Sequence, residues 1–335
     1  MRRMPQIAVQ DARFEMARLP AAETTFAGDV RRGLTASHKF LLPQYFYDAL
    51  GSALFGAICE LPEYYVTRAE TEVLAANGAA IAAAFGAPVR LVELGSGSAR
   101  KTRLLFDALL ARQRELHYAP VDIDPHVLEA SARELLTAYP QLRVHAVAAD
   151  FQNIAGAFAA LPPSDDPTVV LFLGSTIGNL ERNDAADLLR SIRAVLRPDD
   201  ALFLGADLVK PLDVLLPAYD DPLGVTAAFN LNLLARINRE LGGHFDLSRF
   251  AHRALFNADA SRIEMHLVSR GAQRVAIDAL ALEVDFADGE SIHTENSHKY
   301  DSAMLEALAA DGGFRVEARW TDTRQWFADV LLRPV

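Results

Sequence analysis

A short glycine motif within residues 91–102 carries the clearest chemical signal in this sequence. The apolar run of residues 89–94 is typical of a buried parallel strand, and Gly95 and Gly97 follow it directly. Because glycine has no Cβ, the backbone can turn sharply there and a ligand can approach it closely. The helix expected next would direct its free N–H groups at that ligand. The motif therefore predicts a nucleotide-like ligand, although a tight structural turn would use the same residues.

The residues around the two glycines separate two kinds of nucleotide site. A dinucleotide fingerprint has a third glycine where this chain has Arg100, which argues against a nicotinamide or flavin site. The acidic Glu93, just before Leu94 and Gly95, resembles instead the first motif of class I methyltransferases, which bind S-adenosylmethionine. Lys101, early in the expected helix, could meet the carboxylate of that cofactor or could be a solvated helix residue.

Polar side chains also follow the next strands, at the edge of the sheet where ligands bind in open α/β folds. Asp122 and Asp124 end the second expected strand, and Asp124 precedes a proline and suits a helix N-cap. We therefore expect Asp122 to accept the ribose hydroxyls. After the third strand, Asp150 is suited to an adenine amino group and the Phe151 ring to the base. The segment 174–179 follows the fourth strand, and Asp207 ends the fifth, where it could also be an N-cap.

Alternating apolar runs and amphipathic stretches predict a doubly wound α/β sheet that positions these residues. The expected strands cover residues 89–94, 116–123, 142–148, 168–173 and 201–208. The expected helices cover residues 101–114, 125–139, 183–196, 226–241 and 301–311. Strands at 315–320 and 326–332 would form an antiparallel hairpin that closes the parallel sheet, as in class I methyltransferases.

The pattern breaks in two places, and this predicts a second domain. Residues 212–299 read as an insertion with β-like runs at 261–269, 274–277 and 282–286, and residues 1–60 read as an N-terminal extension. We expect a Rossmann-like methyltransferase domain of residues 61–211 and 300–335, and an α+β substrate-binding domain of residues 1–60 and 212–299. Residues 1–30 are expected to be mostly irregular. Thr67 is expected to cap a helix, with Glu70 completing a capping box.

Composition narrows the classes of partner. The chain has 335 residues and a net charge of −11, so nucleic acid and anionic membranes are poor generic partners. The single cysteine, Cys59, cannot form an internal disulfide and fits the cytoplasm. No apolar run of signal-peptide length follows the N-terminal arginines, and the stretch from Val73 to Ala87 is too short to span a bilayer. We expect a cytoplasmic protein, a monomer, with a small-molecule substrate.

From about residue 30 to its end, the chain resembles the histidine Nα-methyltransferases of ergothioneine biosynthesis. The resemblance rests on six strings: LPEYYVTR (61–68), ELGSGSARKT (93–102), LGSTIGN (173–179), FNLN (229–232), SRIEMHL (261–267) and TENSHKY (294–300). It implies trimethylation of the α-amino group of L-histidine to hercynine, with S-adenosylmethionine as cofactor and no metal. It also implies a methyltransferase domain joined to a domain that binds histidine.

The resemblance also implies which residues form the site. Those implied to bind the cofactor are Gly95, Gly97, Lys101, Asp122, Asp150 and Phe151. Those implied to bind substrate are Tyr47, Tyr65, Gly174, Asn179, Tyr219, Met265, Glu295 and Ser297. Tyr65 and Asn179 would orient the reacting amine, Tyr219 the carboxylate, and Glu295 and Ser297 would bind the imidazole.

The assignment of the imidazole to Glu295 and Ser297 is chemically sound. Residues two apart in an extended segment face the same side. A carboxylate can accept a ring N–H, and a serine hydroxyl can serve the other nitrogen in either sense. An exposed strand with alternating polar residues is the plain alternative for these two positions. For the whole chain the alternatives are a nicotinamide-dependent oxidoreductase and a non-catalytic binding module that keeps the cofactor fold.

Overall fold

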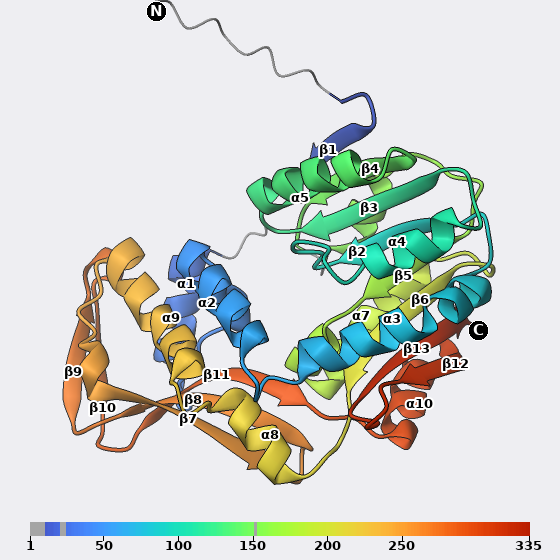
Figure 1. The fold of residues 1–335 in the computed structure, drawn as a ribbon. Helices are drawn as coiled ribbons and strands as arrows, with labels where there is room; N and C mark the ends of the chain where they lie inside the picture. Colours follow the sequence, from blue (N-terminus) through green and yellow to red (C-terminus); the bar gives the residue numbers. More distant parts are fainter. Residues whose placement is uncertain (1–10, 21–24, 151–152) are drawn as a thin grey trace, which may run out of the picture.

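An eight-stranded sheet forms the centre of the larger part of the molecule (Figure 1). The computed structural model describes residues 11–20, 25–150 and 153–335. In spatial order the strands are β1 (Phe14–Arg18), β4 (Leu142–Ala148), β3 (Leu116–Asp122), β2 (Arg90–Leu94), β5 (Thr168–Phe172), β6 (Ala201–Asp207), β13 (Phe327–Pro334) and β12 (Phe314–Thr321). The strands from β1 to β6 are parallel to their neighbours, whereas β13 is antiparallel to both β6 and β12.

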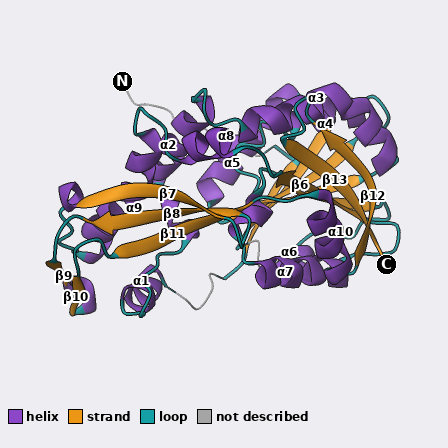
Figure 2. Cartoon of the chain, turned by 90° about the horizontal axis from the view of Figure 1, so that it is seen from below, coloured by secondary structure: helices purple, strands orange, loops and turns teal. Residues whose placement is uncertain are grey.

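Helices cover both faces of this sheet because its parallel strands are apolar on both sides (Figure 2). One face packs against α3 (Val66–Phe85), α4 (Arg103–Leu110) and α5 (Pro125–Ala138). The other packs against α6 (Ile154–Ala159), α7 (Arg182–Val195) and α10 (Ser302–Asp311). Strand β5 has the sequence TVVLF and is buried throughout. The chain is thus an α/β protein whose parallel sheet is closed by an antiparallel hairpin, as its sequence predicts.

A second, smaller group of elements lies beside the sheet and has its own hydrophobic core (Figure 1). Its sheet consists of β7 (Phe250–Asn257), β8 (Arg262–Ser269) and β11 (Ser291–His298), with β8 in the middle. A separate hairpin is formed by β9 (Gln273–Ile277) and β10 (Leu282–Phe286). The helices are α1 (Phe26–Leu34), α2 (Ala49–Glu60), α8 (Leu212–Tyr219) and α9 (Val225–Leu241).

Short 3-10 turns join several of these elements. They are η1 (Pro43–Phe46), η2 (Thr176–Asn179), η3 (Leu247–Arg249) and η4 (Asp278–Leu280). Segments far apart in the chain share the core of the smaller group: Phe46 and Phe229 stack with ring centroids 4.4 Å apart. We therefore propose that residues 26–60 and 212–299 form one unit, which we call the small unit.

Three features of the fold differ from the sequence predictions. Strand β1 pairs with β4 in the large sheet, so residues 14–18 are neither irregular nor part of the small unit. The sequence showed no signal for α8, which contains Pro217, or for β7, whose apolar residues do not alternate. Helix α3 begins at Val66 with no side-chain cap, so the expected capping box of Thr67 and Glu70 is wrong.

Candidate functional site

The glycine turn lies where the order of the strands reverses. From β2 the chain adds β3 and β4 on one side and then crosses to β5 and β6 on the other, and such a switch point is the usual ligand site in open α/β sheets. Gly95 and Gly97 have φ of 68° and 49°, a left-handed conformation that side chains other than glycine rarely adopt. A Cβ placed on either glycine would meet nothing within 4 Å, so the space above the turn is open.

Two acidic residues hold the segments around this turn through hydrogen bonds. The buried Glu93 accepts hydrogen bonds from the Thr102 hydroxyl (2.7 Å) and from the Tyr118 hydroxyl. Burial raises the pKa of Glu93 to about 7, against the effect of these two donors. Asp122 Oδ2 accepts from the Gly97 N–H (2.9 Å), which places this carboxylate beside the turn. Glu93 is therefore structural, and Asp122 lies at the predicted cofactor site.

Three further residues follow the second and third predicted strands: Asp124, predicted as an N-cap, and Asp150 and Phe151, predicted to bind the cofactor. Asp124 caps α5 by accepting from the His126 N–H (2.8 Å), as the sequence predicts. Asp150 lies just after β4, and its backbone carbonyl accepts a hydrogen bond from the Asn153 N–H (2.9 Å). Phe151 lies outside the described residues.

Lys101 and Gly174 both bind Glu70 at the switch point. The sequence predicts that Glu70 completes a capping box, and this prediction is wrong. The fully buried Glu70 forms an ion pair with Lys101 and accepts from the Gly174 N–H (2.7 Å). A Cβ on Gly174 would lie 3.4 Å from Lys101 Nζ. A Cβ on Gly205 of β6 would lie 2.4 Å from Glu70 Oε1, so a glycine is needed there to admit the carboxylate. Glu70 thus joins α3 to the turn before α4 and to the loop after β5 instead of capping its own helix.

Strand β11 presents the predicted imidazole-binding pair on one face. Glu295 and Ser297 are both buried, and Met265 of β8 pairs with Glu295 across the small sheet. Asn179 of η2 donates from Nδ2 to Glu295 Oε1 (3.3 Å). A Cβ on Gly178 would lie 3.0 Å from the His298 carbonyl oxygen, so the missing side chain lets η2 approach β11 this closely. The turn after β5 and the small unit therefore meet at Glu295.

The electrostatics around Glu295 are set by burial and one lysine. Burial raises the pKa of Glu295 to about 7, and the positive charge of Lys299 opposes that rise. The same lysine donates to the Ser297 hydroxyl (2.7 Å) and to the Tyr219 hydroxyl (2.7 Å). These two hydroxyls are themselves 2.8 Å apart. Ser297 and Tyr219, predicted as separate contacts, thus share one buried cation.

Asp207 links this group to Tyr65. Its Oδ2 accepts from the Tyr65 hydroxyl (2.7 Å) and pairs with Lys299 Nζ (2.7 Å), and Lys210 pairs with Oδ1. Burial alone would raise the pKa of Asp207, but Lys299 and Lys210 outweigh it and lower the pKa. Burial lowers the pKa of Lys210 to about 8. The sequence offered Asp207 as a ligand-end or N-cap residue and gave no role to either lysine.

The two adjacent tyrosines point to different surroundings. Tyr65 is 2% exposed; its hydroxyl is held by Asp207, and its ring lies 5.3 Å from that of Trp326. Tyr64 packs edge-on against Tyr219, with ring centroids 6.3 Å apart, and against Phe55 at 6.1 Å. Burial raises the pKa of Tyr64 well above its usual value, and nearby Tyr219 adds to the effect. Tyr64, and not Tyr65, therefore belongs to a group of packed rings that we call the aromatic wall, formed by Tyr47, Phe55, Tyr64, Tyr219 and Phe229.

Tyr47 belongs to the same wall. Its ring is edge-on to Phe55 (5.6 Å) and Phe229 (5.8 Å), and 44% of the residue is exposed. Burial of its hydroxyl region raises the pKa of Tyr47, and the charge of Glu295 contributes. The predicted substrate residues Tyr47, Tyr219 and Glu295 are thus brought into one region.

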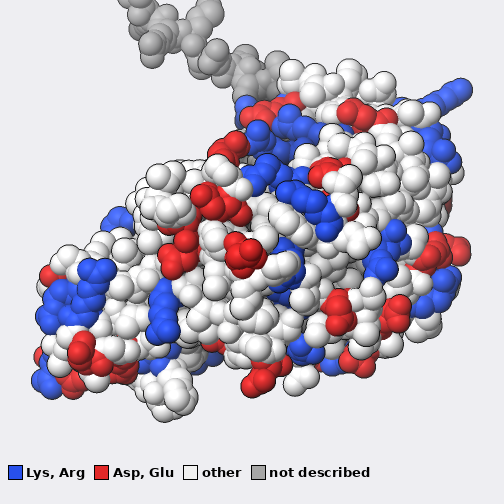
Figure 3. Space-filling model, turned by 60° about the horizontal axis from the view of Figure 1, so that its bottom comes forward, with Lys and Arg blue, Asp and Glu red and all other residues white. Residues whose placement is uncertain are grey.

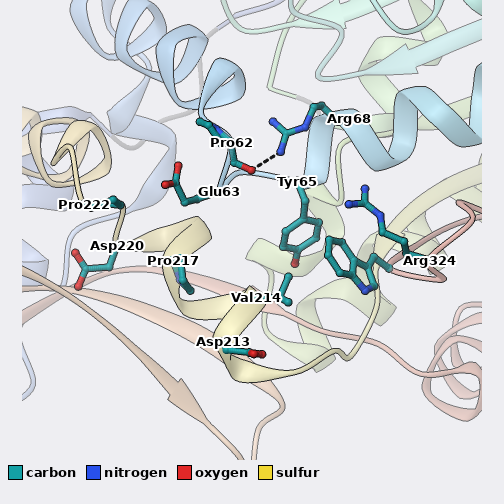
Figure 4. A pocket seen from close by; sticks show the side chains of 11 residues that line it. Pro62, Glu63, Tyr65, Arg68, Asp213, Val214, Pro217, Asp220, Pro222 and Arg324 are labelled. Atoms are coloured by element: carbon teal, nitrogen blue, oxygen red, sulfur yellow. Dashed lines mark hydrogen bonds between the residues drawn. The ribbon is translucent and has the colours of Figure 1, made fainter.

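A cavity of about 610 Å³ is lined in part by Tyr65 (Figure 4). It opens between the segment 62–68, helix α8 and Trp326, and Figure 4 shows Arg68 bonded to the Pro62 carbonyl at its rim (2.6 Å). Tyr65 is the predicted site residue that lines it, whereas Asn179, Glu295 and Ser297 do not. This cavity is therefore separate from the region where the predicted substrate residues meet.

A family model for histidine-specific, S-adenosylmethionine-dependent methyltransferases matches residues 26–334. The chain belongs to this family. The histidine N-alpha-methyltransferase of Mycolicibacterium smegmatis is 47% identical over 294 residues, which cover 88% of this chain and 90% of that protein. That of Mycobacterium tuberculosis is 46% identical with the same coverage. Ergothioneine biosynthesis protein 1 of Schizosaccharomyces pombe is 27% identical over 83% of this chain but only 36% of that protein.

The family's cofactor fits the residues around the glycine turn. The open space above Gly95 and Gly97 leaves room for a ligand against the backbone. Asp122 offers a carboxylate for ribose hydroxyls, and the Lys101 ammonium group, which pairs with Glu70 through one N–H, has further N–H donors for the methionine carboxylate. This enzyme is therefore an S-adenosylmethionine-dependent methyltransferase, and Asp122 and Lys101 would hold opposite ends of the cofactor.

On the face in Figure 3, acidic and basic side chains are interspersed among neutral ones. In the described part of the chain, no helix is both long and apolar enough to cross a membrane. Within those residues there is also no group of three or more histidine, cysteine, aspartate or glutamate side chains arranged to hold a metal ion.

Proposed function

We propose that this enzyme transfers three methyl groups from S-adenosylmethionine to the α-amino nitrogen of L-histidine and forms hercynine, the first step of ergothioneine biosynthesis. The observation that carries the proposal is the hydrogen bond from Asn179, in the turn after β5, to Glu295, which shares a buried face of β11 with Ser297. The mycobacterial relatives are named for histidine N-alpha-methylation, and they support the same substrate. We further propose that the protein acts as a cytoplasmic monomer on the free amino acid, with no nucleic acid or membrane partner.

The small unit supplies the contacts to the imidazole ring. Glu295, when ionised, accepts the ring N–H, and Ser297 serves the other nitrogen. Met265, paired with Glu295 across the sheet, supplies apolar surface beside the ring. Because Lys299 holds a positive charge near Glu295, the carboxylate form is accessible near neutral pH despite its burial.

The large sheet supplies the contacts to the amine. Asn179 uses its amide N–H on Glu295, which leaves its amide oxygen to accept an N–H of the substrate amine. Gly174 lies five residues before Asn179 in the loop after β5, and its missing side chain leaves room beside Lys101 Nζ. When bound, S-adenosylmethionine supplies an electrophilic methyl group. The chain's own contribution is to orient the neutral amine and to exclude water, and positioning of this kind supplies a large share of rate enhancement.

The tyrosine that faces the amino acid is proposed to be Tyr64, in place of the predicted Tyr65. The Tyr65 hydroxyl already donates to Asp207 and accepts from Lys210 (2.8 Å), so its hydrogen is not free for substrate. Tyr64 lies against Tyr219 and Phe55, beside the Glu295 region.

Tyr64→Phe is expected to lower kcat/KM for histidine by about tenfold through loss of one polar contact, whereas Tyr65→Phe leaves kcat/KM within about threefold. Tyr65→Phe should instead lower the free energy of unfolding by about 1–2 kcal/mol, because Asp207 loses a buried donor. Steady-state kinetics and urea unfolding of both variants decide this. The reverse order of the two kinetic effects would restore Tyr65 as the residue at the amine.

Mass spectrometry of the purified protein with S-adenosylmethionine and an equimolar mixture of amino acids tests the proposed function directly. A single new species at histidine plus three methyl groups is expected. Methylation of a different amino acid would contradict the roles of Glu295 and Ser297 while keeping the cofactor site. Cofactor binding with no methylated product would contradict the proposed reaction itself.

A further inference from the structure

Lys299 is a buried cation whose hydrogen-bonding capacity is completely used. The residue is 1% exposed, and an ammonium group has three N–H donors and no acceptor. Its Nζ lies 2.7 Å from each of three oxygens, which belong to Asp207, Tyr219 and Ser297. The favourable field of Asp207 outweighs the cost of burial and raises the pKa of Lys299, so the lysine is charged. Every donor of Lys299 therefore has a fixed partner.

The charge of Lys299 limits how many hydroxyl hydrogens Tyr219 and Ser297 can offer to a ligand. Both hydroxyl oxygens accept from Lys299, and each hydroxyl has one hydrogen of its own. The 2.8 Å hydrogen bond between the two hydroxyls uses one of these hydrogens. Only the other remains for a ligand. While their mutual bond persists, Tyr219 and Ser297 cannot both donate to a substrate.

We propose that Lys299 is a positioning residue that joins Tyr219 and Ser297 into one hydrogen-bonding unit, which offers the substrate a single O–H hydrogen. This inference rests on the proposed function, in which these two side chains contact histidine. If one hydroxyl is removed, the other loses its fixed orientation together with its partner. Recognition of the imidazole by Ser297 and recognition of the rest of the amino acid by Tyr219 are therefore coupled.

A double-mutant cycle measures this coupling. Tyr219→Phe, Ser297→Ala and the double variant are compared with wild type by calorimetric titration with histidine in the presence of S-adenosylhomocysteine. Because either single change breaks the unit, the double variant should bind histidine about as weakly as the single variant with the lower affinity. The product of the two single effects should exceed the double effect by about tenfold.

Lys299→Met removes the charge that holds the unit while keeping an unbranched side chain of similar length. We expect the dissociation constant for histidine to rise by about tenfold or more, with that for S-adenosylmethionine changed by less than about twofold. In the Lys299→Met background, the effects of Tyr219→Phe and Ser297→Ala should become additive. A merely structural role for Lys299 would not change the additivity of these two substitutions.

Lys210→Met is the matched control, because Lys210 is also a buried lysine paired with Asp207. It donates to Tyr65 and to the Leu208 carbonyl and has no hydrogen bond to Tyr219 or Ser297. Its loss should lower stability but leave the dissociation constant for histidine within about threefold.

The outcomes separate this inference from the proposed function. If Lys299→Met does not fold, the cycle in the wild-type background still decides. The inference is overturned, and the proposed function is not, if the fold-increases in the histidine dissociation constant of Tyr219→Phe and Ser297→Ala multiply to within about twofold of the increase in the double variant. A folded Lys299→Met protein that binds histidine normally also overturns the inference. Wild-type protein that binds no histidine overturns the proposed function and, with it, this inference.

Discussion

Glu295→Gln is expected to lower kcat/KM for histidine by about 10- to 100-fold, because a charge-assisted hydrogen bond to the ring becomes a neutral one. The same change should stabilise the protein in mildly alkaline solution. Burial raises the pKa of Glu295 from 4.5 to about 7, so the folded chain holds this proton more tightly than the unfolded chain does. The resulting stability is fully present below pH 4.5 and is lost as the pH rises through about 7.

Glutamine avoids this loss because it carries no charge to bury. Above about pH 7 the variant should exceed wild type in free energy of unfolding by up to about 3 kcal/mol, and below about pH 4.5 the two should agree. Urea unfolding at a series of pH values measures this difference. Glu283→Gln, on the exposed side of β10, is the control and should differ from wild type by less than about 0.5 kcal/mol. A variant less stable than wild type at about pH 8 would show that ionised Glu295 is well solvated or fully paired.

The second large effect is expected at Asp207, which is fully buried between two lysines. Asp207→Asn leaves Lys210 and Lys299 buried without their shared anion, and loss of one partner from a buried ion pair costs about 3–5 kcal/mol. Asp213→Asn, on an exposed position of α8, is the matched control and should cost less than about 0.5 kcal/mol.

The penalty at Asp207 should depend on pH in a definite direction. Without the carboxylate the two lysines avoid burial of charge by losing protons, and near neutral pH the unfolded chain keeps those protons. Folding must then remove these protons, which lowers the free energy of unfolding. This cost becomes smaller as the pH approaches the ordinary lysine pKa of about 10.4, because the unfolded chain then loses the protons as well. Chemical unfolding near pH 7 and near pH 10 should show a smaller penalty at the higher pH. A penalty below about 1 kcal/mol near pH 7 would contradict the structural role of Asp207.

The elements of the large sheet could be predicted because their signals are local. Strand β5 is an apolar run, the glycine turn follows β2 directly, and Asp124 stands immediately before Pro125 at the start of α5. The pairing of β1 with β4 could not be predicted, because Phe14 meets Val144 and nothing in five residues identifies so distant a partner. Glu70 shows the same limit: its local spacing indicated a cap, but its partners Lys101 and Gly174 come from other elements.

Some residues of the candidate site could also be predicted from local sequence, whereas others depend on contacts between distant segments. The string around Glu295 and Ser297 marks a polar strand, and its alternation places both side chains on one face. The choice between Tyr64 and Tyr65 depends on partners far away in the chain, because the Tyr65 hydroxyl meets Asp207 of β6 whereas the Tyr64 ring packs against Tyr219 of α8. Lys299 takes its importance from Asp207 and Tyr219, which lie in segments far from it in the chain.

The position of β13 sets a limit on how this protein can be made. The last strand of the chain lies inside the large sheet, between β6 and β12, and is not at its edge. Until β13 has been synthesised, β6 has an open edge, although the small unit is already complete in sequence. Such exposed strand edges promote aggregation, and pairing over long sequence distances is slow. The central sheet therefore stays open until β13 pairs with β6, and removal of β13 would expose the edge of β6 and leave an aggregation-prone product instead of a smaller enzyme.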